Sequence, residues 1–312
     1  VSILSELVKQ WRSILVRAAP DLMIADHAPT ALLAARTMEI PRVLLGSGFL
    51  SPPVQSPFPS LQAWREISRD ELMIMDQTVL TTVNRVLEGL GLSQWQRLCE
   101  LFAGVEDNFL ATFAELDHYP RRNQDNYWGL LVDKYSGESP VWPQGAEKYV
   151  FAYLKSDAGY FTQVLSQLST VNCNLLIYAD KVDDHIKMHY QSDRLLFSDR
   201  PLNMGDIAKQ SDAVICNGGH NTVMTILLAG KPLIILPSFL EQVITGMRVE
   251  ESGAGLVANS RAMQRQPDRM LRKLLTNKIY TQRAAGFAKK YRDFDAKAML
   301  DRAASRCIEL LS

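Results

Sequence analysis

The residues best placed to do chemistry lie between Ser211 and Gln242. A short apolar run, Ala213–Cys216, is followed at once by Asn217-Gly218-Gly219, and a helical pattern begins with His220-Asn221-Thr222. Glycines carry no Cβ, so the backbone at Gly218 and Gly219 can approach a ligand closely. The first turn of a helix adds free N–H groups and a partial positive charge. This pattern predicts an anion site for a phosphate or diphosphate, with tight strand–helix packing as the alternative reading of the glycines.

The elements that must position this turn can be read on either side of it. Ala213–Cys216 has the length of a buried strand, and the apolar residues from Val223 to Leu228 have helical spacing. Gly230 stands where a C-cap glycine is expected, and Pro232 follows it. Leu233–Leu236 then predicts a second buried strand. The order is strand, glycine turn, helix, strand, with the turn at the carboxyl end of a strand, where ligands of open α/β sheets bind.

This segment resembles the donor motif of the family 1 glycosyltransferases, the inverting nucleotide-sugar-dependent enzymes of the GT-B fold, which include bacterial macrolide, flavonoid and UDP-glucuronosyl transferases. In that family His-x-Gly-x-Asn/Gly-Ser/Thr binds the donor diphosphate, a Gly-x-Pro follows the helix, and an acidic residue with Gln holds the donor sugar. Gly230 and Pro232 match the Gly-x-Pro. The resemblance implies diphosphate binding by Asn217, Gly218, Gly219, His220, Asn221 and Thr222. It implies sugar binding by Glu241 and Gln242.

The chain departs from the family pattern in three places. Asn217 replaces the usual His, and Thr225 replaces a Glu that often binds the ribose. Asp199-Arg200-Pro201-Leu202 stands where plant members have Trp-x-Pro-Gln, whose Trp stacks on the base, so the nucleobase stays open. Arg200 is either a phosphate or base contact or, as is more frequent, a solvated side chain. His220 is either a substitute cation for the missing His or a solvent-facing helix-start residue.

The first 49 residues resemble the second half of the family's acceptor domain. They predict a helix over 1–18, a strand at Leu22–Ala25, a helix at Pro29–Arg36 and a strand at Arg42–Leu45. The resemblance implies that Asp26 orients a catalytic His that takes the acceptor proton; the alternative is that Asp26 caps the following helix. The family's base normally lies in an opening strand–glycine–helix unit, and we expect this unit to be missing. His27 adjoins Asp26, but neighbouring residues of a strand usually point apart.

Further elements are predicted along the rest of the chain. Helices are expected at Leu61–Leu92 and Trp95–Phe102, and short strands at Phe109–Leu116 and Tyr127–Leu131. Four apolar residues near the long helix favour a core position over an acceptor pocket: Trp64, Leu72, Met73 and Met75. A second series predicts strands at Tyr149–Tyr153, Leu175–Tyr178, Arg194–Phe197 and Gly255–Ala258, with helices at Tyr160–Leu168, around Ile207, at Asp268–Leu275 and at Tyr280–Lys290.

The composition argues against several other classes of function. The chain has 312 residues, 47% of them hydrophobic, and 34 basic residues balance 34 acidic ones, so no global field favours nucleic acid. The four cysteines form no CxxC and no metal-ligand spacing, so no metal site is expected. Cys173 and Cys216 are predicted to be buried free thiols, which suits a reducing cytoplasm. No apolar run approaches the roughly 20 residues of a membrane span.

Together these features predict an α/β protein of the GT-B class with two Rossmann-like doubly wound domains facing a cleft. We expect an acceptor domain at 1–140 that lacks its N-terminal strands, a donor domain at 141–294, and a helix at 295–312 that returns to the first domain. The implied reaction is inverting transfer of a sugar from a UDP- or dTDP-sugar to a small hydroxylated acceptor, without metal or other cofactor. The alternatives are a catalytically impaired nucleotide-sugar-binding remnant and a nucleotide-sugar epimerase on the same fold.

Overall fold

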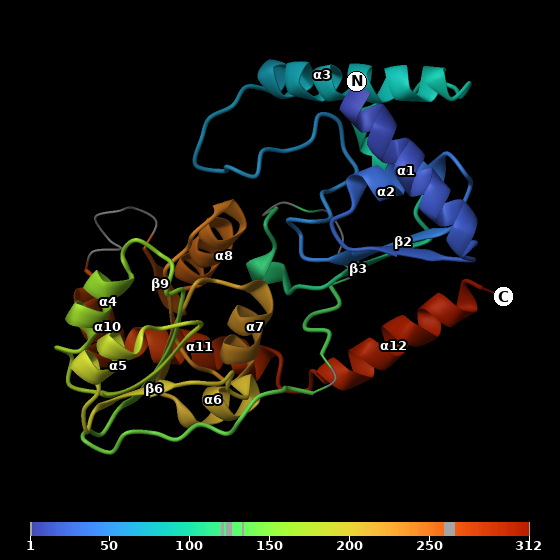
Figure 1. Ribbon diagram of the computed structural model, residues 1–312. Coiled ribbons are helices and arrows are strands. Elements are labelled where there is room, and N and C mark those ends of the chain that lie inside the picture. The colour runs from blue at the N-terminus through green and yellow to red at the C-terminus, as the bar shows by residue number, and fades with distance from the viewer. Residues whose placement is uncertain (1, 120–121, 123–126, 133, 259–265, 312) are drawn as a thin grey trace. The chain divides into compact units, whose positions relative to one another are not determined.

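The computed structural model describes residues 2–119, 122, 127–132, 134–258 and 266–311. The chain divides into two compact units (Figure 1). Unit 1 comprises Val1–Leu131 with Ala298–Ser312, and unit 2 comprises Val132–Lys297. Both divisions fall at other positions than the expected domain ends at 140 and 294. No helix among the described residues is both long and apolar enough to cross a membrane.

Unit 1 is built on a parallel sheet of three strands in the order β1-β2-β3. Its helices and strands are α1 (Ser2–Ala18), β1 (Met23–Ala25), α2 (Pro29–Arg36), β2 (Arg42–Gly46), α3 (Arg69–Gly89), β3 (Asp107–Leu110) and α12 (Ala296–Glu309). Short 3-10 turns lie at Leu98–Leu101 and Ala114–Leu116. All three strands therefore end at the same edge, with Asp26 directly after β1.

The helices of unit 1 are held by two apolar clusters. The first joins α1, α2 and α3 to the sheet through residues such as Leu32, Leu44 and Leu87. The second joins β2 and β3 to α12 through Val43, Phe109 and Ala303. Polar contacts add to the second cluster: the Arg306 guanidinium lies 2.9 Å from a carboxylate oxygen of Asp107, and Arg302 lies over the Trp128 ring. The last helix therefore packs on the three-stranded sheet, although it follows unit 2 in the chain.

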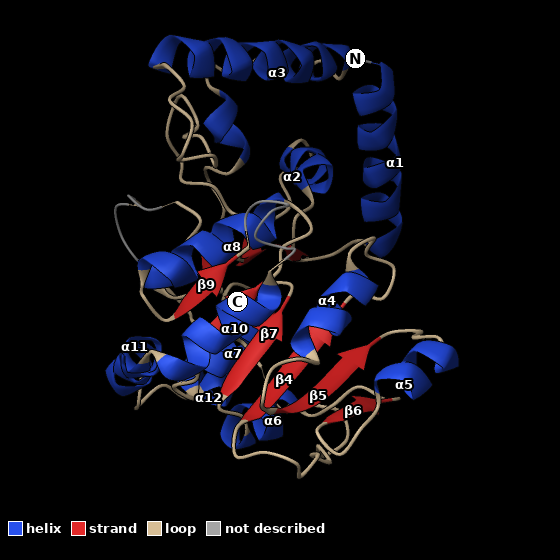
Figure 2. Cartoon of the chain, turned by 90° about the vertical axis from the view of Figure 1, so that its left-hand side faces the viewer, coloured by secondary structure: helices blue, strands red, loops and turns tan. Residues whose placement is uncertain are grey.

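Unit 2 contains a parallel sheet of six strands in the order β6-β5-β4-β7-β8-β9, part of which is seen in Figure 2. The strands are β4 (Tyr149–Leu154), β5 (Asn174–Ala179), β6 (Leu195–Ser198), β7 (Ala213–Cys216), β8 (Leu233–Ile235) and β9 (Gly255–Val257). The helices are α4 (Phe161–Leu168), α5 (Asp184–Tyr190), α6 (Met204–Gln210), α7 (His220–Leu228), α8 (Leu240–Glu251), α10 (Pro267–Thr276) and α11 (Lys278–Lys290). The strand order reverses between β4 and β7, which is the topological switch point of a doubly wound sheet.

The core of unit 2 follows from the spacing of its apolar residues. In α4, Phe161, Val164, Leu165 and Leu168 lie at positions i, i+3, i+4 and i+7, and all four are buried. They pack with α10 on one face of the sheet. Alternate strand residues point to the other face, where α7 contacts α6 and α11.

Several element predictions are confirmed and others are wrong. β7 and α2 have the predicted bounds. The strand predicted at Phe109–Leu116 ends at Leu110, because its neighbour β2 pairs with it only as far as Gly46. At Tyr127–Leu131 a single bridge joins Tyr127 to Leu110 instead of a strand. The helix predicted at Leu61–Leu92 starts later, where Ser68 and Glu71 form a capping box.

The apolar residues before and in α3 also differ from expectation. Trp64, Met73 and Met75 are 46%, 42% and 57% exposed. The core position favoured for them is therefore wrong, because the buried stripe of α3 is made by Leu80, Val83, Val86 and Leu87 further along the helix.

Candidate functional site

The glycine turn after β7 has a backbone that only glycine suits. Gly218 has a φ of +89°. A Cβ at this position would lie 2.8 Å from Ile235 Cγ2 and 3.3 Å from the Gln242 carbonyl oxygen. Gly219 is the N-cap of α7, and no side chain caps the helix. A Cβ there would meet only the Thr222 hydroxyl, at 3.9 Å. The first N–H groups of α7 therefore begin beside open space, as an anion site requires.

Asn217 provides a second, independent sign of a ligand. Its side chain is 92% buried, and its Oδ1 has no hydrogen-bond partner among the described residues. A buried amide atom without a partner costs about 1–3 kcal/mol. The oxygen and nitrogen of an amide exchange places on a half-turn of the side chain, so Asn217 can offer either an acceptor or a donor. Such a group, directly before Gly218-Gly219, is explained by a ligand that completes its hydrogen bonding.

The next three predicted residues form the first turn of α7. His220 is half-buried, and its Nδ1 lies 3.5 Å from the hydroxyl of Thr245, which is fully buried in α8. This contact shields His220 partly from solvent, and its role as a substitute cation stays a prediction. Asn221 is exposed and Thr222 is half-buried. Their side chains are therefore accessible at the mouth of the turn.

The two residues predicted to hold the donor sugar lie in the first turn of α8, after β8. The Gln242 backbone lies against Gly218, so the structure brings the predicted sugar-binding and diphosphate-binding segments together. The Gln242 side chain is buried, and its Oε1 accepts a hydrogen bond from the Ser238 N–H at 2.8 Å. Glu241 is half-buried. The amide oxygen of Gln242 is thus already used in fixing the β8–α8 loop.

Cys216, the last residue of β7, is inert at neutral pH. Burial raises the pKa of its thiol to about 12, although the backbone N–H of Gly218 donates to the sulfur and opposes this. Burial also raises the pKa of Cys173 to about 11. Both are buried free cysteines, as predicted.

Residues 199–202 supply no aromatic ring for a base. Asp199 forms an ion pair with Lys187, with oxygen and nitrogen 2.6 Å apart. Arg200 is 75% exposed and pairs with Glu138 at 2.6 Å, so its guanidinium already has a carboxylate partner. Leu202 is buried.

In unit 1, Asp26 is exposed at the carboxyl end of β1. It does not cap α2, whose N-cap is Ala28 without a side-chain hydrogen bond. The capping interpretation of Asp26 is therefore wrong. His27 is exposed with a φ of +44°, and its ring lies 6.4 Å from that of Phe49. Beneath them is a mostly apolar pocket of about 120 Å³ whose lining includes His27, Phe49 and Leu32.

A family comparison agrees with the geometry of the glycine turn. Residues 163–308 match the model of the erythromycin biosynthesis protein CIII-like C-terminal domain. This range contains the whole segment from Asn217 to Gln242. This match, together with the similar proteins described below, supports a family 1 glycosyltransferase.

Curated relatives of this family support the assignment at low identity. A PGL/p-HBAD biosynthesis rhamnosyltransferase of Mycobacterium bovis (strain BCG / Pasteur 1173P2) is 24% identical over 271 residues, which cover 81% of this chain and 59% of the relative. A PGL/p-HBAD biosynthesis glycosyltransferase of Mycobacterium tuberculosis (strain ATCC 25177 / H37Ra) is 26% identical over 265 residues, covering 79% and 60%. The chain spans about three fifths of the length of these relatives.

Solved structures share the fold. The glycotransferase of kitacinnamycin superposes with a TM-score of 0.70 at 14% identity, covering 98% of this chain and 80% of that one. Spinosyn rhamnosyltransferase SpnG, complexed with thymidine diphosphate, has a TM-score of 0.66 at 12% identity and covers 97% and 81%. At such identities the likeness establishes the fold alone, and it confirms the predicted GT-B class.

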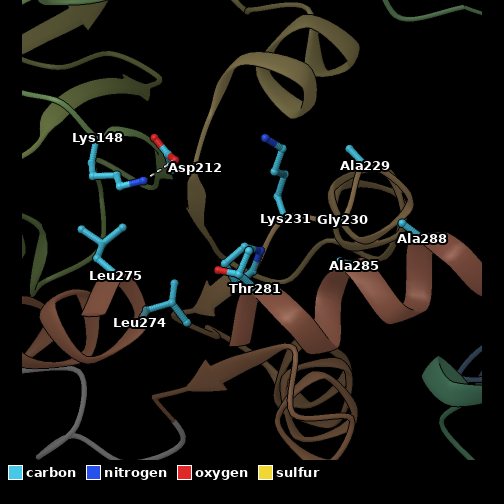
Figure 3. A pocket seen from close by; sticks show the side chains of 11 residues that line it. Lys148, Asp212, Ala229, Gly230, Lys231, Leu274, Leu275, Thr281, Ala285 and Ala288 are labelled. Atoms are coloured by element: carbon cyan, nitrogen blue, oxygen red, sulfur yellow. Dashed lines mark hydrogen bonds and ion pairs between the residues drawn. The ribbon is translucent and has the colours of Figure 1, made fainter. Parts of the chain in front are cut away.

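Unit 2 has a further pocket, of about 360 Å³, at the amino ends of its strands (Figure 3). Its lining includes Lys148, Asp212 and Pro232, which directly precede β4, β7 and β8. Ligands of doubly wound sheets bind at the carboxyl ends of the strands. This pocket lies at the amino ends, so it is away from the donor turn. Among the described residues, no three His, Cys, Asp or Glu side chains gather closely enough to hold a metal ion.

Sequence reasoning missed two clusters. In unit 1 the Asp117 carboxylate is buried. It accepts hydrogen bonds from Arg122 Nε at 2.7 Å, the Tyr127 hydroxyl at 3.0 Å and the Tyr119 N–H at 3.1 Å. Arg122 also donates to the Ser51 carbonyl at 2.7 Å, which fixes the loop after β2. In unit 2 Tyr135 contacts Thr225 of α7 across a long sequence separation. Neither cluster has a local motif from which it could be predicted.

Proposed function

We propose that the chain binds the diphosphate of a nucleotide-sugar at the N-terminus of α7 and takes part in transferring the sugar, with inversion, to a small hydroxylated acceptor. The observation that carries this proposal is the buried, unpaired Oδ1 of Asn217 beside the uncapped helix start at Gly219. Similarity to the family 1 glycosyltransferases supports it. The named relatives are transferases, which favours transfer over epimerisation.

The chemistry follows from these groups. The acceptor oxygen attacks the anomeric carbon while the bond from that carbon to the diphosphate oxygen breaks, and the acceptor proton passes to a base. Negative charge develops on the leaving diphosphate, next to the first N–H groups and positive dipole end of α7. Asn217, Gly218, Gly219, His220, Asn221 and Thr222 form this diphosphate site in our proposal. It requires no metal or other cofactor.

We assign the remaining roles on the same basis. Glu241 and the amide nitrogen of Gln242, whose oxygen accepts from the Ser238 N–H, bind hydroxyls of the transferred sugar, because α8 begins next to Gly218. Asp26 orients the base for the acceptor hydroxyl, because it is an exposed carboxylate at a strand end and does not cap a helix. The donor is a dTDP- or UDP-sugar, and two structural neighbours were solved with thymidine diphosphate. We place the reaction in the cytoplasm, where free thiols persist.

A transfer assay tests the proposal. The chain is incubated with dTDP-rhamnose or UDP-glucose and a panel of phenols and macrolide aglycones, and nucleoside diphosphate release and the anomeric configuration of the product are measured. We expect release that depends on the acceptor and a product of inverted configuration. Binding of a nucleotide-sugar without turnover would instead favour the nucleotide-sugar-binding alternative. A product of retained configuration would contradict the proposed mechanism.

A further inference from the structure

The segment from Tyr135 to Ser139 is bound to the start of α6 by several contacts. Glu138 N–H donates to the Pro201 carbonyl at 2.9 Å, and Asn203 N–H donates to the Glu138 carbonyl at 2.8 Å. Ser139 donates to Asp206 at 2.9 Å. A Cβ on Gly137 would lie 2.6 Å from the Leu202 backbone, so only glycine allows this close approach. These contacts fix the segment, and Tyr135 with it, on unit 2.

Tyr135 is held through its ring, its backbone carbonyl and its hydroxyl. Its ring lies on Gly205, where a Cβ would come within 2.7 Å of it, and its carbonyl accepts from the Asn203 amide at 3.0 Å. Its hydroxyl lies 3.1 Å from the hydroxyl of Thr225, one turn beyond Asn221 on the same face of α7. Tyr135 as a whole is half-buried.

The hydrogen-bond donors in this chain of groups can be assigned. The Thr225 hydroxyl has one proton, which it donates to the Asn221 carbonyl at 2.8 Å. The phenol must therefore be the donor in its contact with Thr225. The lone pairs of the Tyr135 oxygen remain available, so the group that binds there next must be a donor. A phosphate oxygen at neutral pH has mainly acceptors to offer, whereas a sugar hydroxyl can donate.

The order of the helices indicates which sugar of the proposed donor carries the hydroxyl that donates to Tyr135. α7 lies between α8 and α6 in both views (Figures 1 and 2). In the proposed function the transferred sugar lies at the first turn of α8 and the diphosphate at the start of α7. The nucleoside must then lie on the α6 side, where Tyr135 is. We propose that the Tyr135 hydroxyl accepts a hydrogen bond from a ribose hydroxyl of the donor nucleotide; this inference rests on the proposed function.

Calorimetric titration of matched ligands tests the inference. The wild-type chain and Tyr135→Phe are titrated with uridine diphosphate, its 2′-deoxy and 3′-deoxy analogues, and inorganic pyrophosphate. One neutral hydrogen bond corresponds to about a 3- to 10-fold change in affinity. We expect Tyr135→Phe to lower the affinity for uridine diphosphate by this factor. The affinity for pyrophosphate, and for the one analogue that lacks the bound hydroxyl, should stay unchanged.

Tyr149→Phe is the control, because it removes the same phenol hydroxyl at the amino end of β4, where it donates to Gln144 at 3.3 Å, away from the donor turn, and its affinities should equal those of the wild type. Three results would each overturn the role of Tyr135. Tyr135→Phe could lose affinity equally for uridine diphosphate and both deoxy analogues, lose affinity equally for pyrophosphate, or lose no affinity at all. Failure of the wild-type chain to bind any of the nucleotides would instead contradict the proposed function, and the inference with it.

Discussion

The backbone of Gln242 lies against Gly218, so the first turn of α8 and the glycine turn before α7 form one packed unit. A Cβ on Gly218 would lie 3.3 Å from the Gln242 carbonyl and 2.8 Å from Ile235 Cγ2. We predict that Gly218→Ala lowers the free energy of unfolding by at least about 2 kcal/mol, because it combines a left-handed backbone with steric overlap.

Denaturant unfolding measures this change. Gly159→Ala is the control: nothing lies within 4 Å of a Cβ there, and its φ is outside the left-handed region. Gly159→Ala should be neutral or stabilising by up to about 1 kcal/mol. Equal effects of the two substitutions would argue against the close packing of the turn.

Glu241 is predicted to act on the sugar and not on the nucleotide. Glu241→Gln keeps the shape of the side chain and removes its charge. We expect the affinity for the nucleotide-sugar to fall about 10-fold, the order of one hydrogen bond to a charged group. The affinity for the free nucleoside diphosphate should stay unchanged.

The matched control is Glu251→Gln, in the last turn of the same helix, where the carboxylate is 57% exposed and pairs with Arg248. Competition binding with both ligands gives the two affinities for each variant. A parallel loss of both affinities in Glu241→Gln would place Glu241 outside the sugar site.

The ion pair of Asp117 and Arg122 holds the loop after β2 in unit 1. The two side chains are 1% and 7% exposed. Asp117→Asn leaves the guanidinium buried without its counter-charge, and loss of such a partner costs about 3–5 kcal/mol. Urea unfolding of this variant should show a loss of that order.

Asp293→Asn is the comparison for this pair, because Asp293 and its partner Arg292 are 89% and 73% exposed. Exposed pairs contribute about 0–1 kcal/mol. If Asp117→Asn were as mild as Asp293→Asn, the buried pair would not be what fixes the loop.

Alkaline pH should destabilise unit 2 through Cys216. Its pKa is raised by burial from 9.0 to about 12, so the folded state retains a proton that the unfolded chain loses. Stability is therefore unaffected below about pH 9 and falls as the pH rises toward 12. Near pH 10 this group should account for a loss of about 1 kcal/mol.

Cys216→Ala removes this contribution. The difference in unfolding free energy between wild type and variant should shrink between about pH 8 and pH 10. A constant difference over this range would mean that the thiol does not titrate with a raised pKa.

The local part of the candidate site could be predicted from the sequence. Ala213–Cys216, the two glycines and the helix after them are contiguous, and the physical rules for strands, helix starts and glycine act over a few residues. The start of α3 was also readable, since Ser68 and Glu71 have capping-box spacing, although helical periodicity favoured an earlier start.

Contacts over long separations could not be predicted in this way. Tyr135 reaches Thr225, and Arg122 reaches the Ser51 carbonyl, only because the folded sheets bring these segments together. The strand predicted at Phe109–Leu116 was too long because a strand ends where its neighbour ends, at Gly46, and single-sequence patterns do not contain that neighbour.

The central claim is that the start of α7 binds the diphosphate of the donor. Gly219→Asp places a carboxylate in the open space before the first N–H groups of α7, where it would repel an anion. Gly286→Asp makes the same charge change in α11, where nothing lies within 4 Å of a Cβ. In calorimetric titration with thymidine and uridine diphosphates, we expect wild type and Gly286→Asp to bind alike and Gly219→Asp to lose at least about 30-fold in affinity. Equal affinity of all three proteins for the same nucleoside diphosphate would contradict the claim.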